Sequence, residues 1–147
     1  EYYLKNYRED YDKVYIEQDF YLQIENTYIH GIIDRINIKN NQAEIIDFKT
    51  NKVDNKNDLI KYYQPQLQLY AYVVKKIMNI EISGAYILFL ETGELEKVDI
   101  SPEALDRNFK KISNFIEFVN ENSSIEQYEK IHNCGEYCKY KLLCNIN

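Results

Sequence analysis

The 147-residue chain lacks any hydrophobic run that approaches the ~20 residues of a membrane-spanning helix. Its first residues carry no signal-peptide pattern, and we therefore expect a cytoplasmic protein with no membrane partner. The chain also has fewer positive than negative residues: 24 Asp and Glu residues outnumber 18 Lys and Arg residues, and the formal net charge is −6. A chain with a net negative charge does not bind nucleic acid tightly through its overall electrostatic field. A neighbouring basic domain could nevertheless deliver such a substrate.

Cysteine is scarce and confined to the end of the chain, as Cys134, Cys138 and Cys144. An odd number in so short a segment does not form a closed disulfide framework, and metal binding is the better interpretation. Thiolates suit Zn²⁺ and iron–sulfur clusters, both of which take four ligands. His132 could complete a local zinc site, so zinc remains an alternative for this cysteine-rich tail, residues 132–147.

The chain also lacks internal repeats and low-complexity segments. Its composition, 45% hydrophobic and 29% charged, is typical of a globular protein, and the length suffices for one domain with a core. Because the first residue is Glu1 rather than a methionine, we expect an N-terminally truncated fragment.

The most informative stretch consists of two β-rich runs, residues 28–38 and 43–49, on either side of a polar break. Asn40 and Asn41 tolerate the positive φ angles that a two-residue hairpin turn requires. We therefore predict a β-hairpin with these two asparagines at the centre of its turn.

This register would bring two carboxylates together. Counting outward from the turn pairs Asp34 with Asp47, and like charges at a Cβ separation of ~5 Å destabilise a sheet unless something neutralises them. Side-chain alternation places Asp34 on an apolar face with Ile32 and Ile36, and Lys49 on the same face as Asp47. Because buried carboxylates need a partner and their oxygens are hard ligands, the pattern predicts a Mg²⁺ or Mn²⁺ site.

The remaining periodicities predict a mostly helical segment from Leu59 to Met78 after a polar loop, residues 51–58. Pro65 lacks an amide donor, so we place the start of the main helix near it. Three further strands are predicted at residues 13–24, 83–90 and 95–100. A last helix is predicted to be capped by Ser101 and to end near Asn120.

Three successive segments resemble the motifs of one enzyme family. They are Gly31-Ile-Ile-Asp34-Arg35, Ile45-Ile-Asp47-Phe-Lys49-Thr50 and Gln66-Leu-Gln-Leu-Tyr70. In their residues and order they resemble the motifs of the PD-(D/E)xK nuclease superfamily, specifically its RecB-like branch. The resemblance implies an α/β fold of restriction-endonuclease type, a mixed central sheet flanked by helices, in a single domain over residues 1–147.

The resemblance further implies a Mg²⁺- or Mn²⁺-dependent DNA phosphodiester hydrolase. We expect an exonuclease module of a helicase–nuclease in double-strand-break repair and recombination, and its expected partners are DNA and a helicase domain or subunit. Two alternatives are a stand-alone CRISPR-associated exonuclease and a catalytically silent DNA-binding or interaction module.

Roles for individual residues follow from the same resemblance. Asp34, Asp47 and the backbone carbonyl of Phe48 would bind the metal, and Lys49 would position or activate the attacking water. Glu17, in the preceding strand, resembles a family glutamate that approaches the metal.

On the predicted helix, Gln66 and Tyr70 lie four residues apart on one face. By the resemblance they would orient the site and the DNA backbone. The histidine that completes the metal site in the family has no counterpart in the chain, and His30 is expected to be a neighbouring or structural residue.

The cysteines Cys134, Cys138 and Cys144 resemble the three C-terminal ligands of a 4Fe-4S cluster found in this branch. The first two are separated by three residues rather than the usual two. The fourth cysteine would lie upstream of this chain, so the resemblance implies a cluster in the full-length protein.

Overall fold

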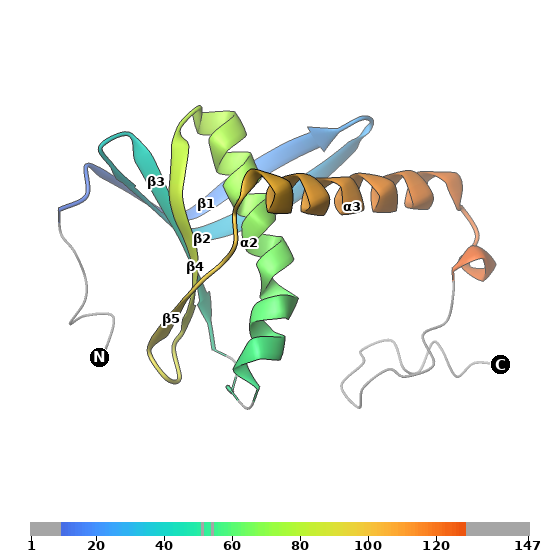
Figure 1. Cartoon of the computed structure of the whole chain (residues 1–147). Helices are drawn as coiled ribbons and strands as arrows, with labels where there is room; N and C mark the ends of the chain where they lie inside the picture. Colours follow the sequence, from blue (N-terminus) through green and yellow to red (C-terminus); the bar gives the residue numbers. More distant parts are fainter. Residues whose placement is uncertain (1–9, 51, 54, 129–147) are drawn as a thin grey trace. The chain divides into compact units, whose positions relative to one another are not determined.

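The computed structural model describes residues 10–50, 52–53 and 55–128. In this part, five strands form one sheet in the order β1-β2-β3-β4-β5 (Figure 1). The strands are β1 (Lys13–Ile24), β2 (Thr27–Lys39), β3 (Gln42–Lys49), β4 (Glu81–Phe89) and β5 (Glu94–Lys97). The helices are α2 (Lys56–Met78), α3 (Pro102–Glu121) and the short 3₁₀ turn η1 (Ile125–Gln127). The sheet is mixed, as predicted, because β3 and β4 are parallel while the other neighbours are antiparallel.

The chain divides into two compact units, residues 1–113 and residues 114–147. The sheet, α2 and the beginning of α3 belong to the first unit, and the end of α3 and η1 belong to the second. The expected single domain stays a prediction. None of the helices in the described part is both long and apolar enough to cross a membrane.

The central hairpin has the predicted turn and register. Asn40 and Asn41 adopt left-handed conformations, with φ of 51° and 58°. Ile36 pairs with Ile45, and both side chains are fully buried. Since the period of a strand is two, this register carries Asp47 to the same buried face as Ile45.

The predicted alternation fails at one position in β2. Ile32, expected on the apolar face, is 47% exposed, whereas Ile33 and Ile36 are both buried. Two buried residues three apart show that the alternation shifts phase between them. The shift coincides with Glu17, which is left unpaired between the Ile16–Arg35 and Gln18–Ile33 pairs of the β1–β2 register and has a φ of 49°. A non-glycine residue in this region bends the strand, and so the sheet is irregular beside the predicted site.

The prediction that the main helix begins near Pro65 is wrong. α2 begins at Lys56, inside the predicted polar loop, and Pro65 lies within it. Asn55 sets the start because its side chain accepts a hydrogen bond from the Asp58 amide (3.4 Å) and donates one to the Asp58 carboxylate (2.6 Å). This N-cap and the packing of the helix outweigh the cost of the internal proline.

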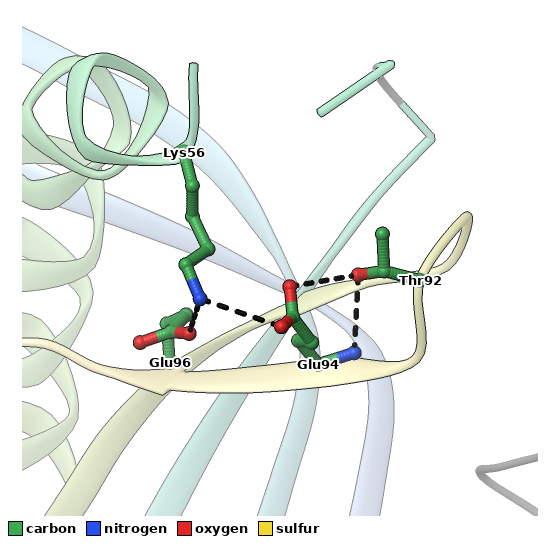
Figure 2. A network of polar contacts seen from close by, with 4 residues as sticks. All are labelled: Lys56, Thr92, Glu94 and Glu96. Atoms are coloured by element: carbon green, nitrogen blue, oxygen red, sulfur yellow. Dashed lines mark hydrogen bonds and ion pairs between the residues drawn. The ribbon is translucent and has the colours of Figure 1, made fainter. Parts of the chain in front are cut away.

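A polar cluster ties the first turn of α2 to β5. Figure 2 shows Lys56 reaching Glu96 (2.8 Å) and Glu94 (3.4 Å), while Thr92 donates to Glu94 (3.2 Å). The hydrogen bond to Glu96 raises the pKa of Lys56, so this side chain is a cation at neutral pH. Each exposed ion pair contributes little, but the set fixes where α2 starts relative to the β4–β5 turn.

Helix α2 is the crossover that the parallel β3–β4 pair requires. It contacts both strands, and Leu67, Ala71 and Val74 are buried. Buried Gln68 donates to the backbone carbonyl of Asp99 (2.8 Å), which satisfies its amide. The middle of the helix is thus buried, whereas Tyr62 near its start and Ile77 near its end are 75% and 57% exposed.

The last predicted strand is shorter than expected, ending at Lys97 rather than at residue 100. The chain leaves the sheet because the Asp99 carboxylate accepts a hydrogen bond from the Ser101 amide (2.9 Å), which forms the turn into α3. Ser101 then caps α3 by accepting from the Ala104 amide (3.4 Å), as predicted.

Candidate active site

The two acidic residues meet where β2 and β3 separate. Pairing of these strands runs from Lys39–Gln42 to Arg35–Ile46, a register that would next oppose Asp34 and Asp47. Beyond it, the amide of Phe48 donates to the Asp34 carboxylate at 2.8 Å. A side-chain acceptor therefore lies where the backbone ladder ends, and this contact anchors the Asp34 carboxylate next to Asp47.

Asp47 is a buried carboxylate, with 2% of its surface exposed. Burial raises the pKa of Asp47, nearby Lys49 opposes the rise, and the charge of Asp34 adds to it. Asp47 Oδ2 lies 2.7 Å from Lys49 Nζ, yet within the described residues no donor reaches this oxygen with hydrogen-bond geometry. We regard the contact as a close ion pair that leaves Asp47 short of one well-directed partner.

Lys49 links the acidic pair to helix α2. Its ammonium donates to Gln66 Oε1 at 3.0 Å, and Gln66 Nε2 donates to the Tyr70 hydroxyl oxygen at 2.7 Å. The Gln66 amide is thereby oriented by both neighbours, one bonded to its oxygen and one to its nitrogen. Strand β3 and helix α2 together hold one continuous polar chain.

Tyr70 ends this polar chain and is buried, with 6% of its surface exposed. Burial raises its pKa, the bond from Gln66 opposes the rise, and the charges of Asp47 and Asp34 add to it. Tyr70 therefore stays a neutral phenol at physiological pH, and its oxygen accepts from Gln66 while its hydrogen is left to donate. Its ring lies edge-on to Phe20, with ring centroids 5.8 Å apart.

The structure thus brings together five predicted residues, namely Asp34, Asp47, Lys49, Gln66 and Tyr70. It does not gather a third metal-binding side chain, because the described residues contain no group of three His, Cys, Asp or Glu side chains suited to a metal. Glu17 is exposed and is not among the paired positions of β1 and β2, and its role as a ligand stays a prediction.

His30 lies away from this group on the β1–β2 pair. Its Nε2 is 2.9 Å from the Asp19 carboxylate, and its ring stacks on Tyr21 with centroids 4.5 Å apart. These contacts agree with the structural role expected for His30. The predicted ligands of the tail, Cys134, Cys138, Cys144 and the alternative His132, lie outside the described residues.

Sequence reasoning missed Tyr63 and assigned no role to Gly31, although this glycine stands in the first motif. The ring centroid of Tyr63 is 4.2 Å from Lys49 Nζ. A Cβ atom on Gly31 would come within 2.6 Å of the Phe20 ring, so the glycine makes room for the ring that contacts Tyr70. The signal for Tyr63 was its spacing of three residues before Gln66, which the misplaced helix start concealed.

The sequence pattern that defines the PD-(D/E)XK nuclease superfamily matches residues 1–145 of the chain. The chain belongs to this superfamily. The predicted family is therefore confirmed, and the mixed sheet with its α2 crossover is a restriction-endonuclease-like α/β fold.

Relatives of this PD-(D/E)XK chain include ATP-dependent helicase/nuclease subunits from two streptococci. The protein of Streptococcus mutans is 34% identical over 95 residues, 60% of this chain and 8% of the relative. The protein of Streptococcus suis is 32% identical over 77 residues, 52% of this chain and 6% of the relative. The chain thus spans less than a tenth of the length of these relatives. The solved structure of SSO0001 is 18% identical, with a TM-score of 0.43 over 76% of this chain and 52% of that one.

The acidic pair of this PD-(D/E)XK chain suits a hard divalent cation. Both donors are carboxylates, which favour Mg²⁺ and Mn²⁺ over softer metals. The buried Asp47 Oδ2 lacks a well-aligned donor among the described residues, and a cation would supply the missing partner. A bound cation would also favour the ionised form that burial opposes.

Proposed function

We propose that this chain is the nuclease domain of a helicase–nuclease and hydrolyses DNA phosphodiesters with Mg²⁺ or Mn²⁺, acting as an exonuclease in double-strand-break repair and recombination. The observation that carries the proposal is the convergence of Asp34, Asp47 and Lys49, with the two acids held by Phe48 and Lys49. The helicase/nuclease relatives support the helicase partner. They also favour this assignment over a stand-alone CRISPR-associated exonuclease.

In this proposal Asp34, Asp47 and the Phe48 carbonyl hold the cation. When bound, the cation acts as a Lewis acid toward the phosphate and favours hydroxide over water. Asp47 must be ionised to serve as a ligand, and the nearby ammonium of Lys49 favours that form. Because Asp47 is buried, little water screens its charge. Its attraction to a cation and to Lys49 is therefore stronger than it would be in water.

Lys49 would then act on the attacking water and on the phosphate oxygens. The water oxygen bonds to phosphorus as the ester P–O bond breaks; the water gives up one proton, and the leaving oxygen takes up one. Lys49 donates to the water and to the negative charge that develops on phosphorus, since its ammonium is held beside Asp47 and Gln66. The Tyr70 hydrogen, free of the Gln66 contact, donates to a backbone phosphate.

For the cysteine tail we propose a 4Fe-4S cluster in the full-length protein, with Cys134, Cys138 and Cys144 as three of its ligands. Anaerobic purification followed by iron, sulfide and zinc analysis tests this. Four irons and four sulfides per protein, with an absorption band near 400 nm, would support the cluster. One zinc and no iron would replace it with the zinc alternative that includes His132.

The nuclease proposal is tested by titrating the full chain with Mg²⁺ or Mn²⁺ in the presence of labelled DNA. Linear single-stranded DNA, linear duplex and circular DNA are compared, since an exonuclease requires an end. Asp47→Ala and Lys49→Ala are expected to lower the rate by at least a hundredfold. Asp106→Ala and Lys110→Ala are matched controls, because both side chains are exposed and distant in sequence from the site.

Cleavage that survives both site substitutions would reject the site, and cleavage of the circle would replace the exonuclease with an endonuclease. Metal-dependent DNA binding without cleavage would favour the silent binding module instead. The net charge of −6 and the small number of ligands gathered in the described part of the chain are the features that favour this second candidate.

A further inference from the structure

Tyr63 approaches the proposed catalytic lysine from helix α2. It precedes Gln66 by three residues and Tyr70 by seven, so the three side chains form one stripe along the helix. Gln66 and Tyr70 belong to the polar chain from Lys49, and the Tyr63 ring centroid lies 4.2 Å from Lys49 Nζ. The same stripe therefore supplies both an amide acceptor and an aromatic ring to one ammonium.

The surroundings of Lys49 make this ring contact effective. The Lys49 side chain is only 15% exposed, and a cation over an aromatic face is held more strongly when water is largely removed. One hydrogen of the ammonium bonds to Gln66, and Asp47 attracts the ammonium as a close ion pair. The ring limits how far the flexible lysine stem can swing from these partners.

We propose that Tyr63 is a positioning residue, whose ring face holds the Lys49 ammonium beside Asp47 and Gln66 in the pose required for phosphodiester hydrolysis. The inference rests on the proposed function, because it assigns Tyr63 a part in the same site. It attributes the effect to the aromatic ring. Phenylalanine at this position is therefore expected to serve, and leucine is not.

The test compares Tyr63→Phe and Tyr63→Leu in the full chain with a linear DNA substrate and Mg²⁺. We expect Tyr63→Leu to lower kcat about tenfold, equivalent to ~1.4 kcal/mol of barrier, with KM changed less than twofold. Tyr63→Phe is expected to remain within twofold of the wild type. Tyr28→Leu is the matched control, because Tyr28 is 65% exposed on β2.

A second measurement reports the contact without relying on activity. The ring current of Tyr63 should shift the Lys49 ε-methylene protons upfield in NMR spectra, with Lys49→Met used to assign them. The shift should persist in Tyr63→Phe and vanish in Tyr63→Leu, while the amide spectrum of the remaining chain is preserved.

Three outcomes would overturn the inference. The first is an equal kcat in the Leu and Phe variants. The second is an effect of Tyr63→Leu on KM alone, and the third is an unchanged chemical shift of the Lys49 ε-methylene protons in Tyr63→Leu. Asp47→Ala keeps this failure separate from failure of the proposed function. If Asp47→Ala abolishes cleavage and Tyr63→Leu does not affect it, only the positioning role falls; if neither matters, the site itself is wrong.

Discussion

At the scale of the residue, Asp47 carries a conflict between folding and chemistry. The carboxylate is buried beside Asp34, and its pKa is raised above the ordinary value of 3.8. As the metal ligand that we propose, Asp47 must nevertheless be ionised at neutral pH. An ionised, buried Asp47 is expected to lower the free energy of unfolding in the absence of metal. Binding of a cation is expected to restore it.

Asp47→Asn is expected to raise Tm by a few degrees in metal-free buffer at pH 7. A carboxyl whose folded pKa is raised contributes stability below its unfolded pKa of ~3.9 and loses it as pH rises through the folded pKa. The wild type thus carries a penalty at pH 7 that the neutral amide avoids. Calorimetry from pH 3.5 to pH 8 checks this, and the Tm difference should vanish at the acidic end.

The same series with Mg²⁺ provides the control for metal binding. Mg²⁺ should raise the Tm of the wild type at pH 7 and leave that of Asp47→Asn unchanged. A variant less stable than the wild type at pH 7 would show that the ion pair with Lys49 outweighs burial.

Gly31 belongs to the family-like motif and is also required by packing. A Cβ atom at this position would lie 2.6 Å from the Phe20 ring, which in turn contacts Tyr70. We expect Gly31→Ala to destabilise the chain by about 1–3 kcal/mol and to lower cleavage through displacement of Tyr70. Urea unfolding and steady-state kinetics measure the two effects.

Gly84→Ala is the matched control for Gly31→Ala. Its Cβ would meet the Tyr86 ring at 2.5 Å, a similar clash on β4. No ring contact or hydrogen bond joins Tyr86 to Tyr70 among the described residues, so stability should fall while the rate per folded molecule is kept. If both variants lose activity equally, the Gly31 effect is general destabilisation.

At the scale of the element, the position of α2 depends on how it starts. The Asn55 cap and the Lys56 contacts with β5 place the first turn, and the helix then carries Tyr63, Gln66 and Tyr70 along one stripe. The site is assembled from a strand end and a helix face. Any change in the helix start therefore acts on the site through α2.

Removal of the cap in Asn55→Ala is expected to cost about 1 kcal/mol of folding free energy. The Asp58 amide loses its acceptor and the first turn frays. Chemical denaturation measures the loss, and Asn55→Ser, which keeps a capping oxygen, should recover most of it. An unchanged midpoint for Asn55→Ala would show that the Lys56 cluster alone fixes the helix start.

At the scale of the whole molecule, the charge of −6 sets limits on DNA binding. Nonspecific affinity comes mainly from cations that neutralise phosphates, and the chain has an excess of anions. Its streptococcal relatives are more than ten times longer than the matched region. Under the proposed function, we therefore expect a helicase partner to supply most of the DNA affinity.

The chain by itself is expected to bind a single-stranded oligonucleotide in metal-free buffer with a Kd of about 10⁻⁴ M or weaker at physiological salt. Fluorescence anisotropy over a salt series measures both the affinity and its slope. A submicromolar Kd with a steep salt dependence would reveal a local basic surface that offsets the net charge.

The sequence by itself determined the hairpin, because Asn40 and Asn41 permit only a narrow choice of turn and the period of two then fixes which residues share a face. It also determined the family, since three motifs in order are far more specific than one. These are local properties, set within a few residues of chain.

Only the tertiary structure decided how helix α2 and its side chains are placed beside the strand residues of the site. The start of α2 depends on an N-cap and on ion pairs to β5, and the phase shift after Ile32 coincides with the left-handed conformation of Glu17 in the neighbouring strand. Tyr63 reaches Lys49 across 14 residues of sequence because the crossover helix packs back on its own sheet. Such contacts depend on packing between distant segments, which no local pattern of residues encodes.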